Sequence, residues 1–229
     1  ISLSLDGLKD MHDKVRGTPG NFEKVADTFD KLRQINGVKV KINTVLTKEN
    51  QNQILDLMKI VREWSPDFHS IILLRGDPIN PEVCLPKIEE LHEIGPKIFE
   101  ILETYDYGKG GATAHILKNY HRYLWNLSLK TMERRTQVIP CLAGTAHQVV
   151  MGNGDVTSCE MLPSVGNIKD NSWSEIMDST ALKDQIQSIK NKECFCTHNC
   201  AMLDSILFNV GSIPKLMYQT VKNKKVSVK

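Results

Sequence analysis

The first 75 residues alternate between segments patterned as strands and segments patterned as helices. Residues 1–6 alternate strictly between apolar and polar side chains, residues 38–46 are rich in β-branched side chains, and residues 68–75 include a run that is apolar on both faces. Helical spacing of apolar residues occupies residues 22–35 and 52–64 between them. Strand–helix–strand–helix–strand with short links predicts right-handed βαβ units and a parallel sheet.

Polar side chains gather where these strands end. Functional groups of parallel α/β sheets lie at the carboxyl ends of the strands, and three strands cannot close a barrel, so we expect the sheet to be part of one. A lone Ser or Asn at such an end is more often a cap than a ligand. Together these side chains could hold a charged ligand with hydroxyl groups, such as an amino acid–ribose compound. They are Ser4, Asp6, Asn43 and, from the turn-rich segment 12–20 that we expect to be a loop, Arg16.

The pattern of the remaining chain predicts helices and one hairpin. Residues 85–105 are predicted to form a helix that is broken or kinked at Gly95-Pro96, and residues 112–133 another helix. Residues 147–158 are predicted to form a hairpin that turns at Gly152-Asn153-Gly154-Asp155. Short helices are expected near residues 172–178, 180–191, 198–208 and 213–222.

Five of the six cysteines lie beyond residue 140, with a spacing typical of a metal site. Cys141 and Cys159 are followed by a tight group, Cys194-Phe195-Cys196-Thr197-His198-Asn199-Cys200. Thiolates this close together repel unless they are oxidised or bind a metal, and soft sulfur ligands suit zinc or an iron–sulfur cluster. The spacing alone does not decide between zinc, an iron–sulfur cluster and buried thiols without metal. His198 is a further candidate ligand if the metal is zinc. Cys84 stands alone and is interpreted as a packed core thiol.

Composition and charge exclude several classes of partner. The chain has 29 basic and 27 acidic residues, a net charge of +2, which predicts neither nucleic acid nor membrane as a partner. No apolar run approaches the ~20 residues of a membrane span. Because a chain of this length needs no disulfide staples and C-x-C is a poor disulfide spacing, we expect a reducing, cytoplasmic location. Residue 1 is an isoleucine that already lies in a strand pattern, so we expect an internal piece of a longer protein.

With these motifs the sequence resembles the radical S-adenosylmethionine superfamily, in its SPASM/twitch branch. Residues 2–7 with His12-Asp13 and Arg16-Gly17 are similar to that family's fourth barrel strand and the loop after it, residues 41–45 to its fifth strand, and residues 71–76 to its sixth. The cysteine part is similar to the family's auxiliary-cluster domain. It comprises Cys141-x12-Gly154-x4-Cys159, Gly166-Asn167-Ile168, Trp173-Ser174-Glu175-Ile176 and the terminal cysteine group.

The resemblance implies a fold and a chemistry. The expected fold is α/β: the C-terminal half of a partial parallel (β/α)6 barrel over residues 1–135, followed by a small Cys-rich α+β auxiliary-cluster domain over residues 136–229. S-adenosylmethionine would lie across the strand ends, where a [4Fe–4S] cluster reduces it to methionine and a 5′-deoxyadenosyl radical that abstracts hydrogen from the substrate. The resemblance also implies a peptide or small-molecule substrate and an external electron donor. Its implied S-adenosylmethionine contacts are Ser4, Asn43, Asp6, Arg16 and Arg75.

Two departures from the family pattern shape the prediction. The C-x3-C-x2-C motif of the radical-generating cluster is absent and belongs upstream of residue 1, so we expect a C-terminal fragment that does not generate the radical alone. Five cysteines remain of the seven in a full SPASM pattern, which suits one auxiliary [4Fe–4S] cluster. Its expected ligands are Cys141, Cys159 and two of Cys194, Cys196 and Cys200. The alternative hypothesis is a non-catalytic, zinc-stabilised module that binds peptides.

Overall fold

A computed structural model describes residues 1–76, 78, 80, 82–107, 112–212 and 214. The chain divides into two compact units, Ile1–Trp125 and Asn126–Lys229, and the boundary falls within helix α5 (Ala112–Arg134). Three strands of the first unit form a parallel sheet, in the order β1 (Ser2–Ser4), β2 (Lys41–Leu46), β3 (Phe68–Leu73). The predicted parallel sheet is therefore confirmed, although each strand is shorter than its sequence pattern.

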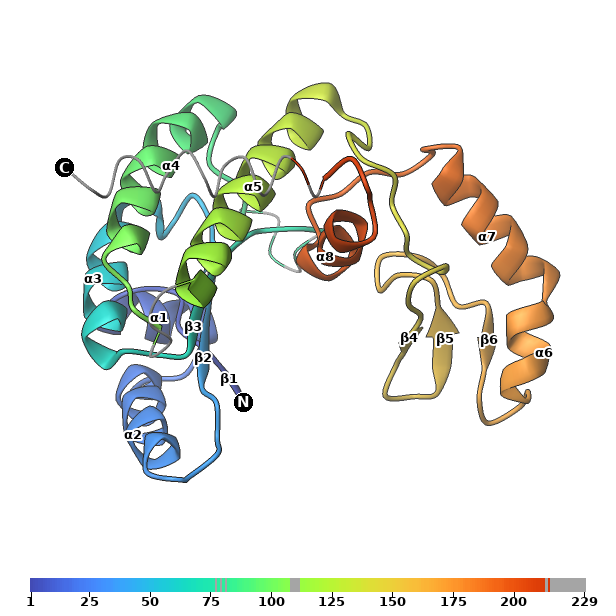
Figure 1. Cartoon of the computed structure of the whole chain (residues 1–229). Helices are drawn as coiled ribbons and strands as arrows, with labels where there is room; N and C mark the ends of the chain where they lie inside the picture. Colours follow the sequence, from blue (N-terminus) through green and yellow to red (C-terminus); the bar gives the residue numbers. More distant parts are fainter. Residues whose placement is uncertain (77, 79, 81, 108–111, 213, 215–229) are drawn as a thin grey trace. The chain divides into compact units, whose positions relative to one another are not determined.

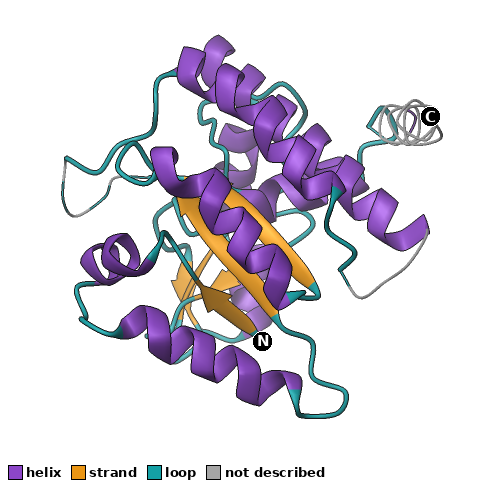
Figure 2. Cartoon of the chain, turned by 90° about the vertical axis from the view of Figure 1, so that its left-hand side faces the viewer, coloured by secondary structure: helices purple, strands orange, loops and turns teal. Residues whose placement is uncertain are grey.

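Helices connect these strands and cover one face of the sheet. Helix α2 (Asn21–Arg33) links β1 to β2, and α3 (Ile54–Trp64), preceded by the 3-10 turn η1 (Gln51–Gln53), links β2 to β3. Figure 1 shows α2 and α3 on the same side of the sheet, and Figure 2 shows helices lying across it. Along β2 the alternate residues Ile42, Thr44 and Leu46 are fully buried, whereas the residues between them are half-buried. The sheet thus has one core face and one less covered face.

A helix that the sequence analysis missed follows β1. Residues 12–20 were expected to be a loop, but α1 spans Lys9–Arg16 and ends at Gly17, whose φ of 63° is in the left-handed region. Charge near the helix ends favours it, with Asp10 in its first turn and Arg16 in its last. Asp13 then accepts hydrogen bonds from the backbone N–H groups of residues 20 (2.6 Å) and 22 (2.8 Å), at the start of α2. Asp13 therefore stabilises the turn between α1 and α2.

The long helices after β3 follow the prediction with one difference. Helix α4 (Ile88–Glu103) runs without a break through Gly95-Pro96, where a break or a kink was expected. Gly95 is buried against Trp125, and a Cβ at residue 95 would lie 2.7 Å from Trp125 Nε1, so close packing requires the glycine. On α5 Leu124 and Leu127 are buried, whereas Ile116 is 50% exposed.

The second unit holds a small antiparallel sheet and three short helices. Strands β4 (Val149–Val150) and β5 (Asp155–Thr157) form the predicted hairpin, and β6 (Gly166–Asn167) pairs with β5. Three predicted helices are confirmed as α6 (Trp173–Asp178), α7 (Thr180–Lys190) and α8 (Asn199–Leu207). The fourth, at residues 213–222, lies outside the described residues apart from residue 214. None of the described helices has the length and hydropathy needed to cross a membrane.

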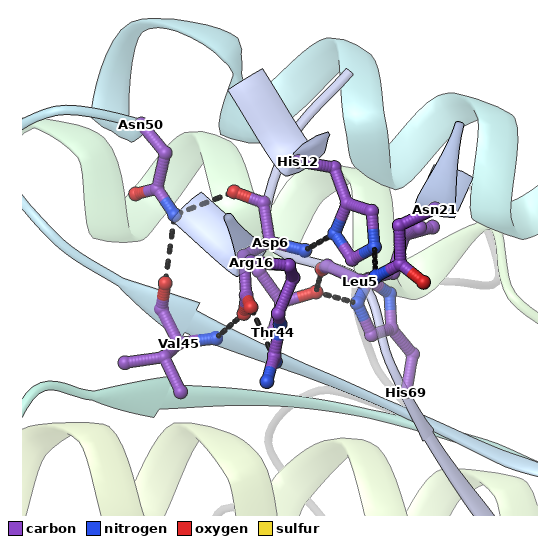
Figure 3. Close-up of polar contacts among 9 residues, drawn as sticks. All are labelled: Leu5, Asp6, His12, Arg16, Asn21, Thr44, Val45, Asn50 and His69. Atoms are coloured by element: carbon purple, nitrogen blue, oxygen red, sulfur yellow. Dashed lines mark hydrogen bonds and ion pairs between the residues drawn. The ribbon is translucent and has the colours of Figure 1, made fainter. Parts of the chain in front are cut away.

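A buried polar chain joins the three strands of the first unit to its helices. Thr44 Oγ1 donates to the Leu5 carbonyl oxygen (2.6 Å) and lies 2.9 Å from His69 Nε2 (Figure 3). The other ring nitrogen of His69 lies 2.9 Å from the Tyr105 hydroxyl, whose single proton is shared between that nitrogen and the Met58 carbonyl oxygen of α3 (2.6 Å). Burial lowers the pKa of His69 to about 3, so its ring is neutral at physiological pH. The chain therefore acts as an uncharged structural link.

We predict that Thr44→Val lowers the free energy of unfolding by about 1–3 kcal/mol, because the buried Leu5 carbonyl and the His69 ring lose a partner that no water replaces. Urea denaturation followed by circular dichroism measures the change. The matched control is Thr28→Val, whose exposed hydroxyl bonds the Lys24 carbonyl on α2 and which should change stability by less than about 0.5 kcal/mol. Equal effects of the two substitutions would contradict the prediction.

Candidate functional site

The carboxyl end of β1 is held by Asp6, a predicted ligand contact. Asp6 is 2% exposed, its Oδ1 accepts the Val45 N–H (2.8 Å), and its carboxylate pairs with Arg16 (Figure 3). Its own N–H donates to His12 Nδ1 (3.0 Å), and Asn50 Nδ2 donates to the Asp6 carbonyl oxygen (2.7 Å). The structure therefore brings Asp6 and Arg16 together as an ion pair that fixes β1, the loop after it and β2.

His12 belongs to this structural network as well. Burial lowers the pKa of His12, and its Nδ1 accepts the Asp6 N–H, so this nitrogen carries no proton. The other nitrogen, Nε2, lies 3.1 Å from Asn21 Nδ2 at the start of α2. Nδ1 thus bonds the backbone at the end of β1, and Nε2, which then carries the ring proton, contacts the side-chain amide of Asn21. Neither of these ring contacts is to a nucleophile. The structure supports the structural interpretation of His12-Asp13 over acid–base chemistry.

Three polar side chains form a row across the less covered face of the sheet. Ser4 is the register partner of Asn43, and Asn43 is the register partner of Ser70. Register partners in neighbouring strands present their side chains to the same face. Asn43 Oδ1 is buried and has no hydrogen-bond partner among the described residues, so the row retains an acceptor for a ligand donor. Sequence analysis missed Ser70, because it lies inside an apolar strand.

Arg75, the last predicted contact of this site, lies two residues beyond β3 and is half-buried. The pattern predicted that β3 would extend to Arg75, whereas the strand ends at Leu73. Asp77, considered as its ion-pair partner, lies outside the described residues.

The second unit brings four of the five predicted cysteine ligands together. Cys141 and Cys194 pack with Cys159 in one apolar cluster, together with Ala143 and Ile189. Burial raises the pKa of the Cys141 and Cys194 thiols, and the nearby thiols raise it further. Cys159 contributes to both shifts and Cys196 to that of Cys194, so Cys194 lies within electrostatic reach of the other three thiols. Without metal, burial keeps Cys141 and Cys194 as neutral thiols near pH 7.

The other two cysteines are separate from this group. Cys200 lies in the first turn of α8 and is exposed. Cys84 is also exposed, so its interpretation as a packed core thiol was wrong. That interpretation rested on the general tendency of lone cysteines to be buried, and the segment before α4 does not bury this one. None of the six cysteines forms a disulfide.

A cavity opens beside three of the four cysteines. Cys141, Cys194 and Cys196 line it, with apolar side chains such as Val138, Ile139 and Ala201 forming much of the remaining wall. The empty space measures about 370 Å³, part of which is open to solvent. Within the described part of the chain, no three His, Cys, Asp or Glu side chains have the arrangement to hold a metal ion. The thiols border a cavity instead, and their soft donor atoms fit an iron–sulfur cluster.

Gln137 holds two of the cysteine segments in place. Its Nε2 donates to the carbonyl oxygens of Ile189 (2.9 Å) and Cys194 (3.0 Å), while its Oε1 accepts the Cys141 N–H (3.1 Å). The side chain is only 8% exposed, so these bonds form away from solvent. Gln137 therefore fixes the first cysteine relative to the terminal group. Nothing in its sequence context indicated this role, because the partners lie about 50 residues further along the chain.

His198, the candidate zinc ligand, lies against Cys159. Its Nδ1 is 3.8 Å from Cys159 Sγ, and its Nε2 is 2.7 Å from Glu160 Oε1. Both His198 and Cys159 are more than 90% buried. The imidazole is thus oriented by a carboxylate toward a predicted cluster ligand, an arrangement that metal sites use outside the ligand shell.

We predict that Gln137→Met lowers the free energy of unfolding of the metal-free protein by about 1–3 kcal/mol and exposes the Cys141 and Cys194 thiols to alkylation, because buried backbone groups lose their partners. Chemical denaturation and mass spectrometry of alkylated peptides measure the two effects. Gln187→Met is the control, since Gln187 is exposed on α7 and bonds only the Asn191 side chain among the described contacts. If both variants match the wild type, Gln137 does not position the cysteines.

Known proteins match both the region of the cysteines and the region of the parallel sheet. Residues 141–201, which contain all five C-terminal cysteines, match the family model of SPASM, an iron–sulfur cluster-binding domain. The chain is 26% identical over 198 residues to the AdoMet-dependent heme synthase of Methanosarcina barkeri, covering 78% of this chain and 53% of that protein. It is also 26% identical over 214 residues to the cysteine-type anaerobic sulfatase-maturating enzyme of Clostridium novyi, covering 87% of this chain and 54% of that enzyme.

The fold agrees with these sequence matches. The structure is similar to that of native anSMEcpe with bound AdoMet and Kp18Cys peptide, with a TM-score of 0.53 and 20% identity over 82% of this chain and 53% of that one. The chain spans about half the length of the curated relatives it matches. The domain match, the relatives and the mixed α/β fold with its parallel sheet confirm the resemblance that the motifs indicated: this chain is similar to radical S-adenosylmethionine enzymes with a SPASM domain.

Proposed function

We propose that Cys141, Cys159, Cys194 and Cys196 hold an auxiliary [4Fe–4S] cluster in a radical S-adenosylmethionine enzyme. One observation carries the proposal: four cysteines from three separate segments gather in one place, three of them lining a cavity, within a region that matches an iron–sulfur cluster-binding domain. When bound, such a cluster supplies a site that accepts and donates single electrons. Cys200 is the spare cysteine in this assignment, because it is exposed on α8.

The protein's own contribution is to prepare and shield the ligands. Metal binding requires thiolates, and burial raises the pKa of Cys141 and Cys194, so loading the site releases protons. The hydrogen bonds of Gln137 hold the two segments before the metal arrives, which limits the ordering needed on binding. The apolar wall around the thiols reduces contact with water and oxygen.

For the sheet we propose that S-adenosylmethionine binds along the row of Ser4, Asn43 and Ser70. The buried, unpartnered Asn43 Oδ1 supports this assignment, since it can accept a hydrogen bond from the amino or hydroxyl groups of such a ligand. Asp6 and Arg16 neutralise one another and position the carboxyl end of β1. Arg16 has further N–H groups with which to bind the ligand's carboxylate, and Arg75 is the remaining candidate.

The wider reaction remains a proposal that rests on relatives. We propose hydrogen abstraction from a peptide or small-molecule substrate by a 5′-deoxyadenosyl radical, with an external electron donor. The match to a sulfatase-maturating enzyme supports a peptide, whereas the match to heme synthases supports a smaller substrate. We further propose that residues 1–135 complete a partial barrel with a segment that precedes them in the full protein, which would be cytoplasmic because its thiols must stay reduced.

We predict that serine substitution of Cys141, Cys159, Cys194 or Cys196 removes most of the iron and of the ~400 nm absorbance from protein purified without oxygen. Cys200→Ser and Cys84→Ser are the matched controls, since both thiols are exposed, and both variants should keep the wild-type iron content. Iron analysis and visible spectroscopy give the result. Loss of iron from Cys200→Ser alone would overturn the ligand assignment. Zinc in place of iron in the wild type would favour the zinc-stabilised binding module.

A second prediction addresses the sheet. Asn43→Ala should weaken binding of S-adenosylmethionine to the full-length protein about tenfold, the effect of one lost hydrogen bond to a charged ligand. Isothermal titration calorimetry under anaerobic conditions measures the affinity. Asn52→Ala, at an exposed position next to α3, is the control and should leave the affinity unchanged. Equal affinities of all three proteins would exclude Asn43 from the site.

A further inference from the structure

One residue of the cavity wall has a buried hydroxyl without a hydrogen-bond partner among the described residues. Thr131 lies in the last turns of α5, is 2% exposed, and lines the cavity beside Cys141, Cys194 and Cys196. Its Oγ1 is fully buried and has no hydrogen-bond partner among the described residues. A threonine in a helix commonly bonds the carbonyl oxygen three or four residues earlier, and Thr131 does not. An isolated buried hydroxyl is unfavourable, so a ligand that fills the cavity is its natural partner.

The other polar side chains on the cavity wall are already engaged. Gln137 makes three hydrogen bonds to the backbone. Ser205 Oγ donates to the Ala201 carbonyl oxygen (2.7 Å) and accepts the Leu142 N–H (3.3 Å). Thr131 differs from both in having its donor unused. A hydroxyl that borders three cysteines and has a proton to donate suits an electron-rich sulfur atom as acceptor.

We propose that the Thr131 hydroxyl donates a hydrogen bond to a sulfur of the iron–sulfur cluster, either a sulfide or a cysteine thiolate, and thereby raises the cluster's reduction potential. This inference rests on the proposed function, because it requires the cluster to be present. Reduction adds negative charge to the cluster, so a hydrogen-bond donor at its sulfur stabilises the reduced form more than the oxidised form. Thr131 is uncharged and does not titrate. It is a positioning and tuning residue rather than a ligand.

The test compares Thr131→Val, which is nearly isosteric but lacks the hydroxyl, with the wild-type full-length protein. Iron and sulfide per chain should be unchanged, while a potentiometric titration followed by electron paramagnetic resonance should give a more negative midpoint potential. Thr131→Ser retains the hydroxyl and should restore the wild-type potential. Ser128→Ala is the matched control on α5: it removes a buried hydroxyl that bonds Met202 Sδ, and it should leave the potential unchanged.

The stability of the metal-free protein provides a second readout, in which loss of the hydroxyl should not be harmful. In the metal-free protein, Thr131→Val should be at least as stable as the wild type, because the lost hydroxyl had no partner there. If valine overpacks the cavity, Thr131→Ala gives a smaller variant without the hydroxyl, for which the same negative shift in potential is expected. An unchanged potential in both variants would overturn the inference and leave Thr131 bonded to water. Absence of iron from the wild type would refute the proposed function itself, before any variant is compared.

Discussion

Four cysteines gathered around one apolar cluster and its neighbouring cavity impose the constraint on which the second unit depends. Cys141 and Cys194 lie in an apolar cluster, and burial together with the neighbouring thiols opposes their ionisation. Such a group stays protonated without a cation and becomes a strong ligand set when a metal stabilises the thiolates. The surrounding structure serves this arrangement: Gln137 ties the first cysteine segment to the last, and His198 lies between Cys159 and a carboxylate.

The first unit solves a different problem, which is to hold three strand ends in register beside a ligand. Asp6 contributes by accepting a hydrogen bond from a backbone N–H of β2 and by forming an ion pair with Arg16. The buried Thr44–His69–Tyr105 chain joins the sheet to α3. Nearly all of these polar groups have hydrogen-bond or ion-pair partners within the protein, so their role is structural. Asn43 Oδ1 is buried without a partner and, unlike the similarly unpaired Tyr107 hydroxyl and His121 Nε2, lies in the row with Ser4 and Ser70. The two units share one feature, since each leaves a buried polar group unpaired where a cofactor is proposed.

Much of the fold and part of each site could be predicted from the sequence, because the relevant signals are local. Hydrophobic patterning gave the three parallel strands, and cysteine spacing gave the metal-site candidates. Helix α1 was missed because its residues have turn propensity, and tertiary contacts of Asp13 and His12 hold it. Strand β6 was missed because two residues carry no period. Ser70, Gln137 and Thr131 could not be predicted, since their roles arise from contacts between distant segments.

The central claim, a [4Fe–4S] cluster on Cys141, Cys159, Cys194 and Cys196, is tested most directly by the metal content of wild-type protein purified without oxygen. Iron, sulfide and zinc are measured per chain, with electron paramagnetic resonance after reduction. This account predicts about four irons and four sulfides per chain from the auxiliary cluster and a signal from a reduced [4Fe–4S] centre. One zinc per chain with no iron or sulfide would contradict it and would make the cysteines a structural zinc site.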